Sequence, residues 1–567
     1  MKYVTLSLSV LLLLSACSNS DSKTDTVSAE ANTTEADAAL ALKAGAPLFS
    51  GMGSHSLTIT ASDSSVQRYF DQGLILAFGF NHAESIRSFK AAQKLDPQCA
   101  MCFWGEALAT GPNINVTSNG SVIMSDADRL TAYAVLQKAL ALKAFASEKE
   151  RAYIDALSAR YNGDVNSDRI PLDIAYAEAM GRLVEKYPED NDAAALYAES
   201  LMNTMPWNYW LGDGDPKPNT VKVISSLERI IENDPQHPLA LHLYIHAIEA
   251  SINPQRAEAA ADKLANLVPG SGHLVHMPAH IYWRVGRYHD ASEANVRAAE
   301  VDEEYIAQCN AQGFYPALYY PHNIHFLWAA SSMEGRSEVA IAAARKVAAN
   351  IRLEQIEQFP TVEFFHTIPL LALTQFGRWD ELLAEPQPPE YLSYSNAIWH
   401  YARGVALSRK GDIDAAKAEH LALKALLGSV KVVFLDSRDY PASSLLGIAN
   451  NLLTGEIAVA ENNLDLAINE FTSAVESQDA LPYTEPPFWY YPTRQSLGVA
   501  YLLAGKPEEA EAVYRKDLTI YPRNGWSMYG LMQSLEAQEK YDAALDVEDK
   551  FDLVWAMADV QLSGSRL

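Results

Sequence analysis

A repeat of 34 residues limits how this chain can fold more than any other feature of its sequence. Units that start at Pro238 and Gly272 lie 34 residues apart, and so do units that start at residues 491 and 525. The period predicts stacked antiparallel helix pairs, in which small residues allow close approach, an aromatic residue fills the seam and proline ends the second helix. In the unit 66–99 these positions are held by Tyr69, Gly73, Phe89, Ala92 and Pro97.

This pattern resembles the tetratricopeptide repeat (TPR), a unit of two antiparallel helices. After the N-terminal leader the chain shows helical periodicity, with one short strand-like stretch at residues 56–60. One helix pair cannot bury its apolar face alone, so neighbouring pairs must stack. We therefore expect an all-α, TPR-type solenoid, an elongated right-handed superhelix whose first helices line a concave groove. We expect two arrays, residues 46–390 with insertions and a His-rich groove, and residues 391–567.

The N-terminus resembles a bacterial lipoprotein signal. Lys2 precedes an apolar run over residues 4–14, which is too short to span a membrane because a spanning helix needs about 20 apolar residues. The run ends in the sequence LSAC, which resembles the lipobox, where the cysteine, here Cys17, is lipid-modified and becomes the new N-terminus. Residues 1–16 are thus a predicted signal peptide and residues 17–45 a polar, lipid-anchored tether. The alternative is an ordinary cleaved signal in which Cys17 is incidental.

The leader and the net charge together limit the partners of the chain. A lipobox implies the cell envelope, and the absence of Asp after Cys17 favours the periplasmic side of the outer membrane, with the lipid as the only membrane contact. The chain has 44 Lys and Arg against 71 Asp and Glu, a formal charge of −27. Nucleic acid is therefore excluded as a bulk partner, because binding it requires a basic face.

Histidines are concentrated in one part of the chain. Eight of the 14 histidines lie between His242 and His325. Spacings of three, four or seven residues place them on single faces of three successive first helices. The TPR resemblance implies that these faces line the groove. Beside Glu249, seven imidazoles are expected to converge there, those of His242, His246, His273, His276, His280, His322 and His325.

Imidazoles that converge from neighbouring helices indicate a metal site. They suit a divalent transition metal such as Zn, Cu or Fe, and the lack of nearby Cys and Met argues against Cu(I). The repeat positions that face the groove centre give five expected ligands, His242, His246, His276, His280 and His325. We expect His273 and His322 to be outer or alternative ligands. One metal ion and two both stay open, and the alternative is a polar groove that grips an acidic peptide.

Other side chains near the cluster are candidates for catalysis or ligand binding. Glu199 and Glu249 are candidate general bases toward a metal-bound water, whose pKa a metal ion can lower to about 7. Candidate contacts for a small molecule or peptide in the groove are Trp207, Tyr320, Arg403, Trp489 and Arg494, and the two arginines are candidates for holding its carboxylate or phosphate group. The alternatives are helix packing for the aromatic residues and intramolecular ion pairs for the arginines.

Three segments carry a more specific resemblance. Residues 272–282 (GHLVHMPAHIY), 320–327 (YPHNIHFL) and 488–495 (FWYYPTRQ) are similar to those of a group of His-rich bacterial TPR lipoproteins. This resemblance implies no particular reaction. Three functions stay open: a metal-containing groove that binds a small ligand or peptide, a metal-dependent hydrolase or oxidoreductase, and a metal-free adaptor for partner proteins.

Overall fold

The computed structural model describes residues 35–118, 123–212, 214–309 and 313–567. The predicted signal peptide, Cys17 and most of the predicted tether lie outside the described residues. The first described residues form helix α1 (Glu35–Ala44), in which Ala44 is buried. Asp37 of this helix pairs with Arg68 at 2.8 Å. The last part of the segment expected as a tether is therefore a helix that packs on the array.

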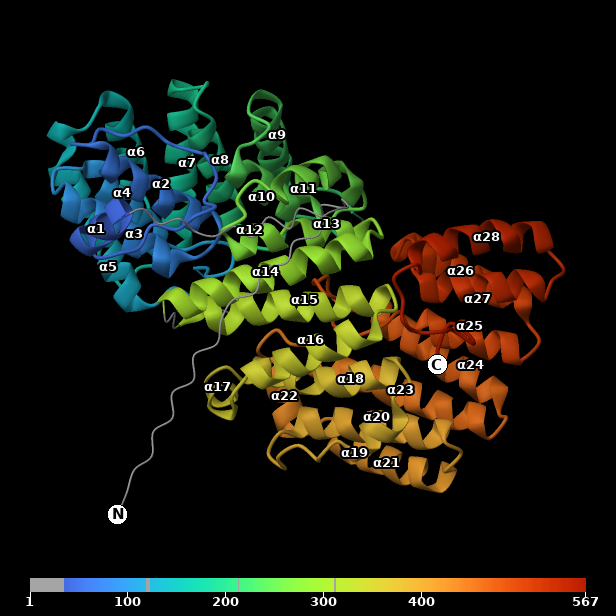
Figure 1. Ribbon diagram of the computed structural model, residues 1–567. Coiled ribbons are helices and arrows are strands. Elements are labelled where there is room, and N and C mark those ends of the chain that lie inside the picture. The colour runs from blue at the N-terminus through green and yellow to red at the C-terminus, as the bar shows by residue number, and fades with distance from the viewer. Residues whose placement is uncertain (1–34, 119–122, 213, 310–312) are drawn as a thin grey trace, which may run out of the picture.

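The first part of the chain folds into helix pairs that follow one another in space (Figure 1). Its helices are α1, α2 (Ser64–Phe78), α3 (His82–Leu95), α4 (Ala100–Thr110), α5 (Asp126–Ala141), η1 (Lys143–Phe145), α6 (Glu148–Ser158), α7 (Ile170–Lys186), α8 (Asn191–Asn203), α9 (Pro218–Asn233), α10 (Pro238–Ile248), η2 (Pro254–Ala257), α11 (Glu258–Leu264), α12 (Gly272–His276), α13 (Pro278–Arg284) and α14 (Tyr288–Cys309).

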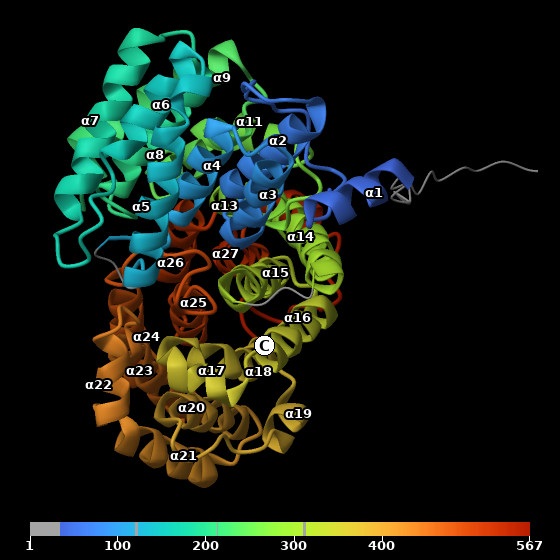
Figure 2. The ribbon, with the colours of Figure 1, turned by 90° about the vertical axis from the view of Figure 1, so that its left-hand side faces the viewer.

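The second part continues in the same way to the C-terminus (Figure 2). Its helices are the short π-helix η3 (Tyr315–Tyr319), α15 (Tyr320–Met333), α16 (Ser337–Asn350), α17 (Leu353–Gln358), η4 (Pro360–Thr367), α18 (Ile368–Gln375), α19 (Trp379–Ala384), α20 (Ser393–Arg409), α21 (Ile413–Leu426), α22 (Val430–Asp436), α23 (Ala442–Ala460), α24 (Leu464–Asp479), α25 (Arg494–Leu503), α26 (Pro507–Ile520), α27 (Gly525–Glu536) and α28 (Tyr541–Val554).

The prediction of an all-α, TPR-type solenoid is confirmed. In the part of the chain that the structure describes, extended pairing is limited to two isolated bridges, Thr117 with Ile123 and Trp210 with Pro216. The strand-like stretch at residues 56–60 is irregular rather than a strand. Among these residues, no helix has both the length and the apolar character needed to cross a membrane.

The repeated glycines and aromatic residues explain how neighbouring helix pairs pack. Phe89 lies between Gly73 and Gly105, where an added Cβ would come within 2.9 Å and 2.3 Å of its ring. Tyr514 lies in the same way between Gly498 and Gly530, with 2.3 Å and 2.2 Å. The small residues are therefore required, because one aromatic ring fills the seam between two successive units.

The solenoid curls until its last repeats contact its middle repeats, so the expectation of an elongated array is wrong. The indole N–H of Trp526 donates to the carbonyl of Ser332 at 2.9 Å, and the ring of Trp555 covers Gly335. Figure 1 shows the last helices, in red, next to the right-hand ends of α13 and α15. Tryptophans outside the repeat positions cause this closure, because they bury apolar area against units far away in sequence.

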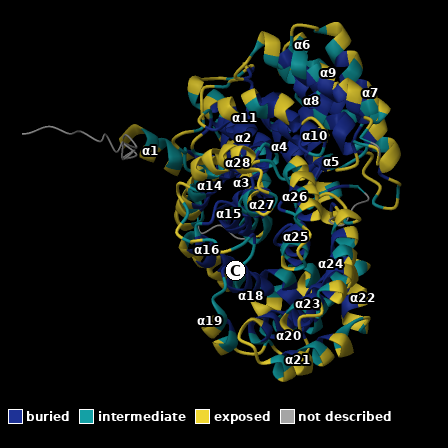
Figure 3. Ribbon diagram, turned by 90° about the vertical axis from the view of Figure 1, so that its right-hand side faces the viewer, coloured by how far each residue is buried: buried dark blue, intermediate teal, exposed yellow. Residues whose placement is uncertain are grey.

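The inner helices of the curled array are almost completely buried (Figure 3). Every residue of α10 is buried, whereas α21 on the outside buries only Ala416 and Leu423. The face expected to form a groove therefore lines a deep cavity that is partly open to solvent, and its histidines are largely buried.

Candidate metal centre

Helices from successive units carry the histidines into the interior. α10 holds two of them and ends at Glu249. The next unit begins with two short helices, α12 and α13, which separate at Met277 because Pro278 lacks the N–H of a continuous helix. The histidines are His242 and His246 on α10, His273 and His276 on α12, His280 on α13, and His322 and His325 on α15.

His242, His246 and His273 form a cluster that we call the first triad, with one nitrogen of each within 4.8 Å of the others. Nδ1–H of His242 donates to the carbonyl of Phe78 at 2.7 Å, and Nδ1–H of His246 donates to Glu249 Oε1 at 2.9 Å. Each neutral ring therefore carries its lone pair on Nε2. Within the described part of the chain, these two Nε2 atoms have no hydrogen-bond partner. Both ring nitrogens of His273 also lack one.

The surroundings keep the first triad uncharged. Burial lowers the pKa of His246, and it lowers those of His242 and His273 well below the ordinary value. The ring of Phe80 covers the cluster, with its centroid 4.6 Å from that of His242 and 5.2 Å from that of His273. The triad thus presents neutral imidazoles, the form that coordinates metals.

His276, His280 and His322 form the second triad, again with one nitrogen of each within 4.8 Å of the others. Nδ1 of His276 lies 2.6 Å from Asn295 Oδ1, and Nδ1 of His280 lies 2.5 Å from Glu249 Oε2. Nε2 of His276 and Nε2 of His280 are only 2.8 Å apart. The His322 ring, which is partly exposed to the cavity, lies 4.8 Å from the ring of His276.

Two buried carboxylates, Glu249 and Glu485, stand against His280. Burial alone would lower the pKa of His280, but the charge of Glu249 and hydrogen bonds to both carboxylates raise it to about 10. Burial and the charge of Glu249 raise the pKa of Glu485 to about 8. Burial opposes ionisation of Glu249, yet His280 and His246 hold its pKa below the ordinary value. Glu249 is thus an anion that accepts hydrogen bonds from one histidine of each triad.

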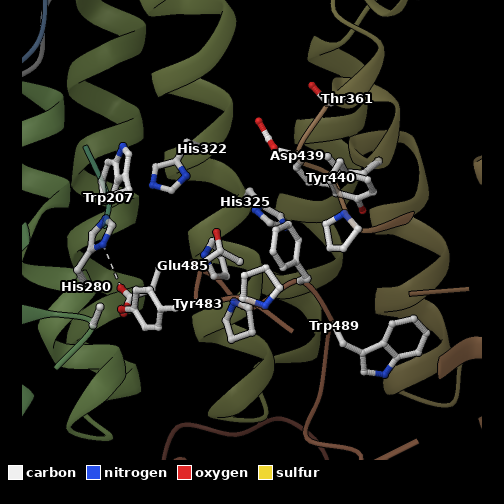
Figure 4. Close-up of a pocket in the computed structure, with 18 of the residues that line it drawn as sticks. Trp207, His280, His322, His325, Thr361, Asp439, Tyr440, Tyr483, Glu485 and Trp489 are labelled. Carbon is white, nitrogen blue, oxygen red and sulfur yellow. Dashed lines mark hydrogen bonds and ion pairs between the residues drawn. The ribbon is translucent and has the colours of Figure 1, made fainter. Parts of the chain in front are cut away.

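A cavity of about 1260 Å³ adjoins the triads. Figure 4 shows Trp207, His280 and His322 on one side of it and Tyr440, Asp439 and Trp489 on the other, with His325 between them. His246 and His273 also reach its surface, whereas His242 and His276 do not. Its walls are rich in aromatic rings, and among the described residues no Lys or Arg lines it. Its wall instead carries four carboxyl groups, those of Glu249, Asp436, Asp439 and Glu485, of which Glu249 and Glu485 face His280.

Some residues expected at the site lie outside the triads. His325 lines the cavity, but its ring stacks on Trp328 at 5.2 Å and belongs to no triad. The hydroxyl of Tyr320 donates to Glu303 Oε1 at 2.9 Å, and its neighbour Tyr319 lines the cavity instead. Glu199 is not a lining residue; burial raises its pKa against the charge of Arg160.

The two arginines expected to hold an anionic group are engaged in ion pairs. Nε of Arg403 lies 2.8 Å from Glu419 Oε1, and its guanidinium lies 4.5 Å from the centroid of the Trp399 ring. Arg494 is held by the two carboxylate oxygens of Asp479. The structure brings neither arginine to the cavity.

Two residues of the site were missed by sequence reasoning. Asn295 lies on α14, the second helix of its repeat unit. Second helices are expected to pack against neighbouring units rather than to line the groove, so no sequence pattern pointed to Asn295. Glu485 directly precedes the aromatic segment that begins at Pro486, and that segment was the available clue. Oε2 of Glu485 lies 3.0 Å from Nδ1 of His280, which is 205 residues earlier in the chain (485 − 280).

A third group of ligand-type side chains lies away from the cavity, formed by His55, Asp192 and His237 and here called the His55 cluster. Nε2 of His55 lies 2.9 Å from Asp192 Oδ1, and Nε2 of His237 lies 3.3 Å from the same oxygen. Nδ1 of His237 accepts the N–H of Ala240 at 3.3 Å and so caps α10. Its Nε2 therefore carries the proton and faces Asp192 as a donor.

Comparisons with known proteins find matches among solved structures only. No protein-family model and no curated protein sequence matches the chain. Solved structures similar to it include yeast Tom70, 12% identical over 85% of this chain and 89% of that chain with a TM-score of 0.27. The P58(IPK) TPR domain is 12% identical over 86% and 99%, with a TM-score of 0.23. Human IFIT1, solved as a dimer with m7Gppp-AAAA, is 11% identical over 87% and 90%, with a TM-score of 0.28. Scores this low carry no argument about the site.

Proposed function

We propose that this protein binds a divalent transition metal in the first triad and holds a small organic ligand in the adjoining cavity. The observation that carries the proposal is the convergence of buried imidazole nitrogens, those of His242, His246 and His273, that lack partners in the described structure. Buried polar atoms are otherwise almost always hydrogen-bonded, and a bound ion is one explanation for such orphans. Metal-binding histidines typically donate their other N–H to a carbonyl or carboxylate, as His242 and His246 do.

The cavity supports a ligand beside the metal. His246 and His273 both belong to the triad and to the cavity wall, so a bound ion would be accessible to a molecule there. Aromatic walls without Lys or Arg, and with four carboxylates, favour a planar or apolar ligand that is neutral or cationic. This differs from the carboxylate or phosphate ligand expected from Arg403 and Arg494.

Metal content measures the main proposal directly. We expect wild-type protein, purified without a His tag or chelator and then reconstituted with Zn(II), to retain about one equivalent or more. His242→Ala should lose the metal of the first triad, while His420→Ala, which removes a ring bonded to Asn450 in the C-terminal array, should lose none. Less than about a tenth of an equivalent of any transition metal in wild type would contradict the proposal and favour a metal-free adaptor.

A metal-dependent enzyme is the second candidate. It is favoured by the first triad, because three protein ligands beside a cavity leave a coordination position for water or substrate, as in catalytic zinc sites. Glu249 is already engaged by His246 and His280, so it supports the ligands rather than standing free as a base. Turnover by zinc-loaded protein in a panel of hydrolase and oxidoreductase substrates, lost in His242→Ala, would support the enzyme.

We also propose that the protein is a lipoprotein of the cell envelope, anchored through Cys17. The lipobox-like sequence supports this location. Cys17→Ser should move the protein from the membrane fraction to the soluble periplasmic fraction with unchanged helical circular dichroism. Membrane-bound Cys17→Ser protein would contradict the anchor.

A further inference from the structure

The second triad presents two ring nitrogens, those of His276 and His280, that face each other. Asn295 fixes the proton of His276, because its Nδ2 donates to the carbonyl of Ala291 at 2.8 Å and leaves Oδ1 as the acceptor. The proton of His276 is therefore on Nδ1, and Nε2 carries the lone pair. Nδ1 of His280 must likewise carry a proton, because it faces two carboxylates, Glu249 at 2.5 Å and Glu485 at 3.0 Å.

When His280 is neutral, two lone pairs therefore point at each other over the 2.8 Å between Nε2 of His276 and Nε2 of His280. This contact is unfavourable unless a cation lies between or beside them. A proton on His280 is one such cation, and a metal ion is the other. A metal ion, unlike a proton, also requires a third ligand within reach of these two nitrogens.

His322 supplies that third ligand. Its ring comes from α15, a separate helix, and lies 4.8 Å from the ring of His276 and 5.8 Å from that of His280. No proton-sharing scheme between His276 and His280 requires it. Three imidazoles from three helices, two of them held through Nδ1 by an amide and by carboxylates, match the construction of a metal site.

We propose that the second triad is a second site for a divalent transition metal, so that the protein holds a two-metal centre. This inference rests on the proposed metal-binding function and extends it. Glu249 joins the two sites, because its Oε1 accepts a hydrogen bond from Nδ1–H of His246 in the first triad and its Oε2 accepts one from Nδ1–H of His280 in the second. The rings of the two triads approach to 5.7 Å between His246 and His280. Both sites border the same cavity, the arrangement in which two metals can bind one ligand together.

Metal stoichiometry separates this inference from the proposed function. We expect wild-type protein dialysed against Zn(II) to hold two equivalents, and His322→Ala and His242→Ala one each. His322 is the preferred position because it is less buried than His276 and His280. The matched control is His289→Ala, a histidine of the same sequence window that pairs with Glu334 outside both triads, and it should keep two equivalents.

Each of the other outcomes contradicts the two-metal centre, the proposed function or both. One equivalent in wild type, lost in His242→Ala but kept in His322→Ala, would mean that the second triad shares a proton only, and the proposed function would stand. One equivalent lost in both variants would mean a single shared site and would also overturn the inference. One equivalent lost only in His322→Ala would support the second triad and overturn the first. No bound metal in wild type would overturn both.

Copper provides an independent measurement on folded protein. Electron paramagnetic resonance of wild type with two equivalents of Cu(II) should show spin–spin broadening, because the two sites are adjacent. His322→Ala with one equivalent should show the sharp spectrum of an isolated Cu(II). An isolated-ion spectrum in fully loaded wild type would contradict the two-metal centre.

Discussion

The first triad and the His55 cluster contain similar residues at similar separations, yet they differ in what their nitrogens do. In the His55 cluster, Asp192 accepts from one ring and lies close to the other, and Nδ1 of His237 is used to cap a helix. In the first triad the Nδ1 protons of His242 and His246 point to fixed acceptors, whereas their Nε2 lone pairs and both nitrogens of His273 have no partner in the described structure. The difference shows that closeness of histidines alone does not define a metal site. The direction of the lone pairs does.

Metal-dependent stability should give the largest contrast between the two regions. A metal that binds only the folded state at 100 times its Kd stabilises it by about 2.7 kcal/mol. With two sites filled to this extent, urea unfolding with and without Zn(II) should show about twice this increment in wild type and in His55→Ala, and only about one such increment in His246→Ala, which keeps the second triad. An equal loss in His55→Ala would remove the distinction between the two regions.

Loss of an outer hydrogen bond should give the next largest effect. Asn295→Leu removes the acceptor that orients His276 and leaves a buried Nδ1–H unpaired. We expect Zn(II) affinity at the second triad to fall about 10- to 100-fold, as for other partners of metal-bound histidines. Asn396→Leu changes an equally buried amide in the C-terminal array and serves as the control. Unchanged affinity in Asn295→Leu, measured by competition with a chromophoric chelator, would contradict the role of this hydrogen bond.

The pH dependence of the metal-free protein should have opposite signs in the two regions. Burial opposes protonation of His55, but the hydrogen bond and charge of Asp192 outweigh it and raise the pKa. The pairing of protonated His55 with Asp192 therefore stabilises the fold fully below the unfolded pKa of about 6.5, and this stabilisation is lost as pH rises through the folded pKa. The lowered pKa of His273 has the reverse effect, because the unfolded chain takes up more protons below about pH 6.5. The free energy of unfolding of wild type relative to that of His55→Ala should therefore fall between pH 6 and pH 8. The stability of wild type relative to His273→Ala should rise over the same range. Unfolding curves with parallel pH profiles for both variants would refute these assignments.

His325 should give the smallest effect. Burial lowers its pKa to about 3, and its ring contacts aromatic side chains rather than either triad. We expect His325→Ala to retain the metal content of wild type in elemental analysis. A loss equal to that of His246→Ala would instead support the ligand set predicted from the repeat register.

Local patterns in the sequence predicted much of this structure. The glycine and aromatic positions gave the helix pairs, and the spacing of His242 and His246 placed both on one face of α10, because such spacings depend on a single helix. The register did not predict that His322 rather than His325 lies beside His276. The segment before α15 is a π-helix, Tyr315–Tyr319, instead of a regular turn of the repeat.

The remaining features depend on contacts between distant segments. The carbonyl of Phe78, which orients His242, belongs to a backbone position that any residue could supply. Glu485 reaches His280 only because the solenoid curls, and the curl depends on contacts such as that of Trp526 with Ser332. A pattern with a period of 34 residues describes neighbours and carries no information about such closure.

The closure also sets an order of events during synthesis. The ribosome releases the segments around His242 and His280 long before it reaches Glu485 and Trp526, so a nascent chain has most of the ligands but lacks the carboxylate behind His280 and the repeats that close the cavity. Maturation of the centre is therefore completed only after translation has passed these residues. A chain truncated before them would keep its histidines in place along α10 to α15 and still lack the finished site.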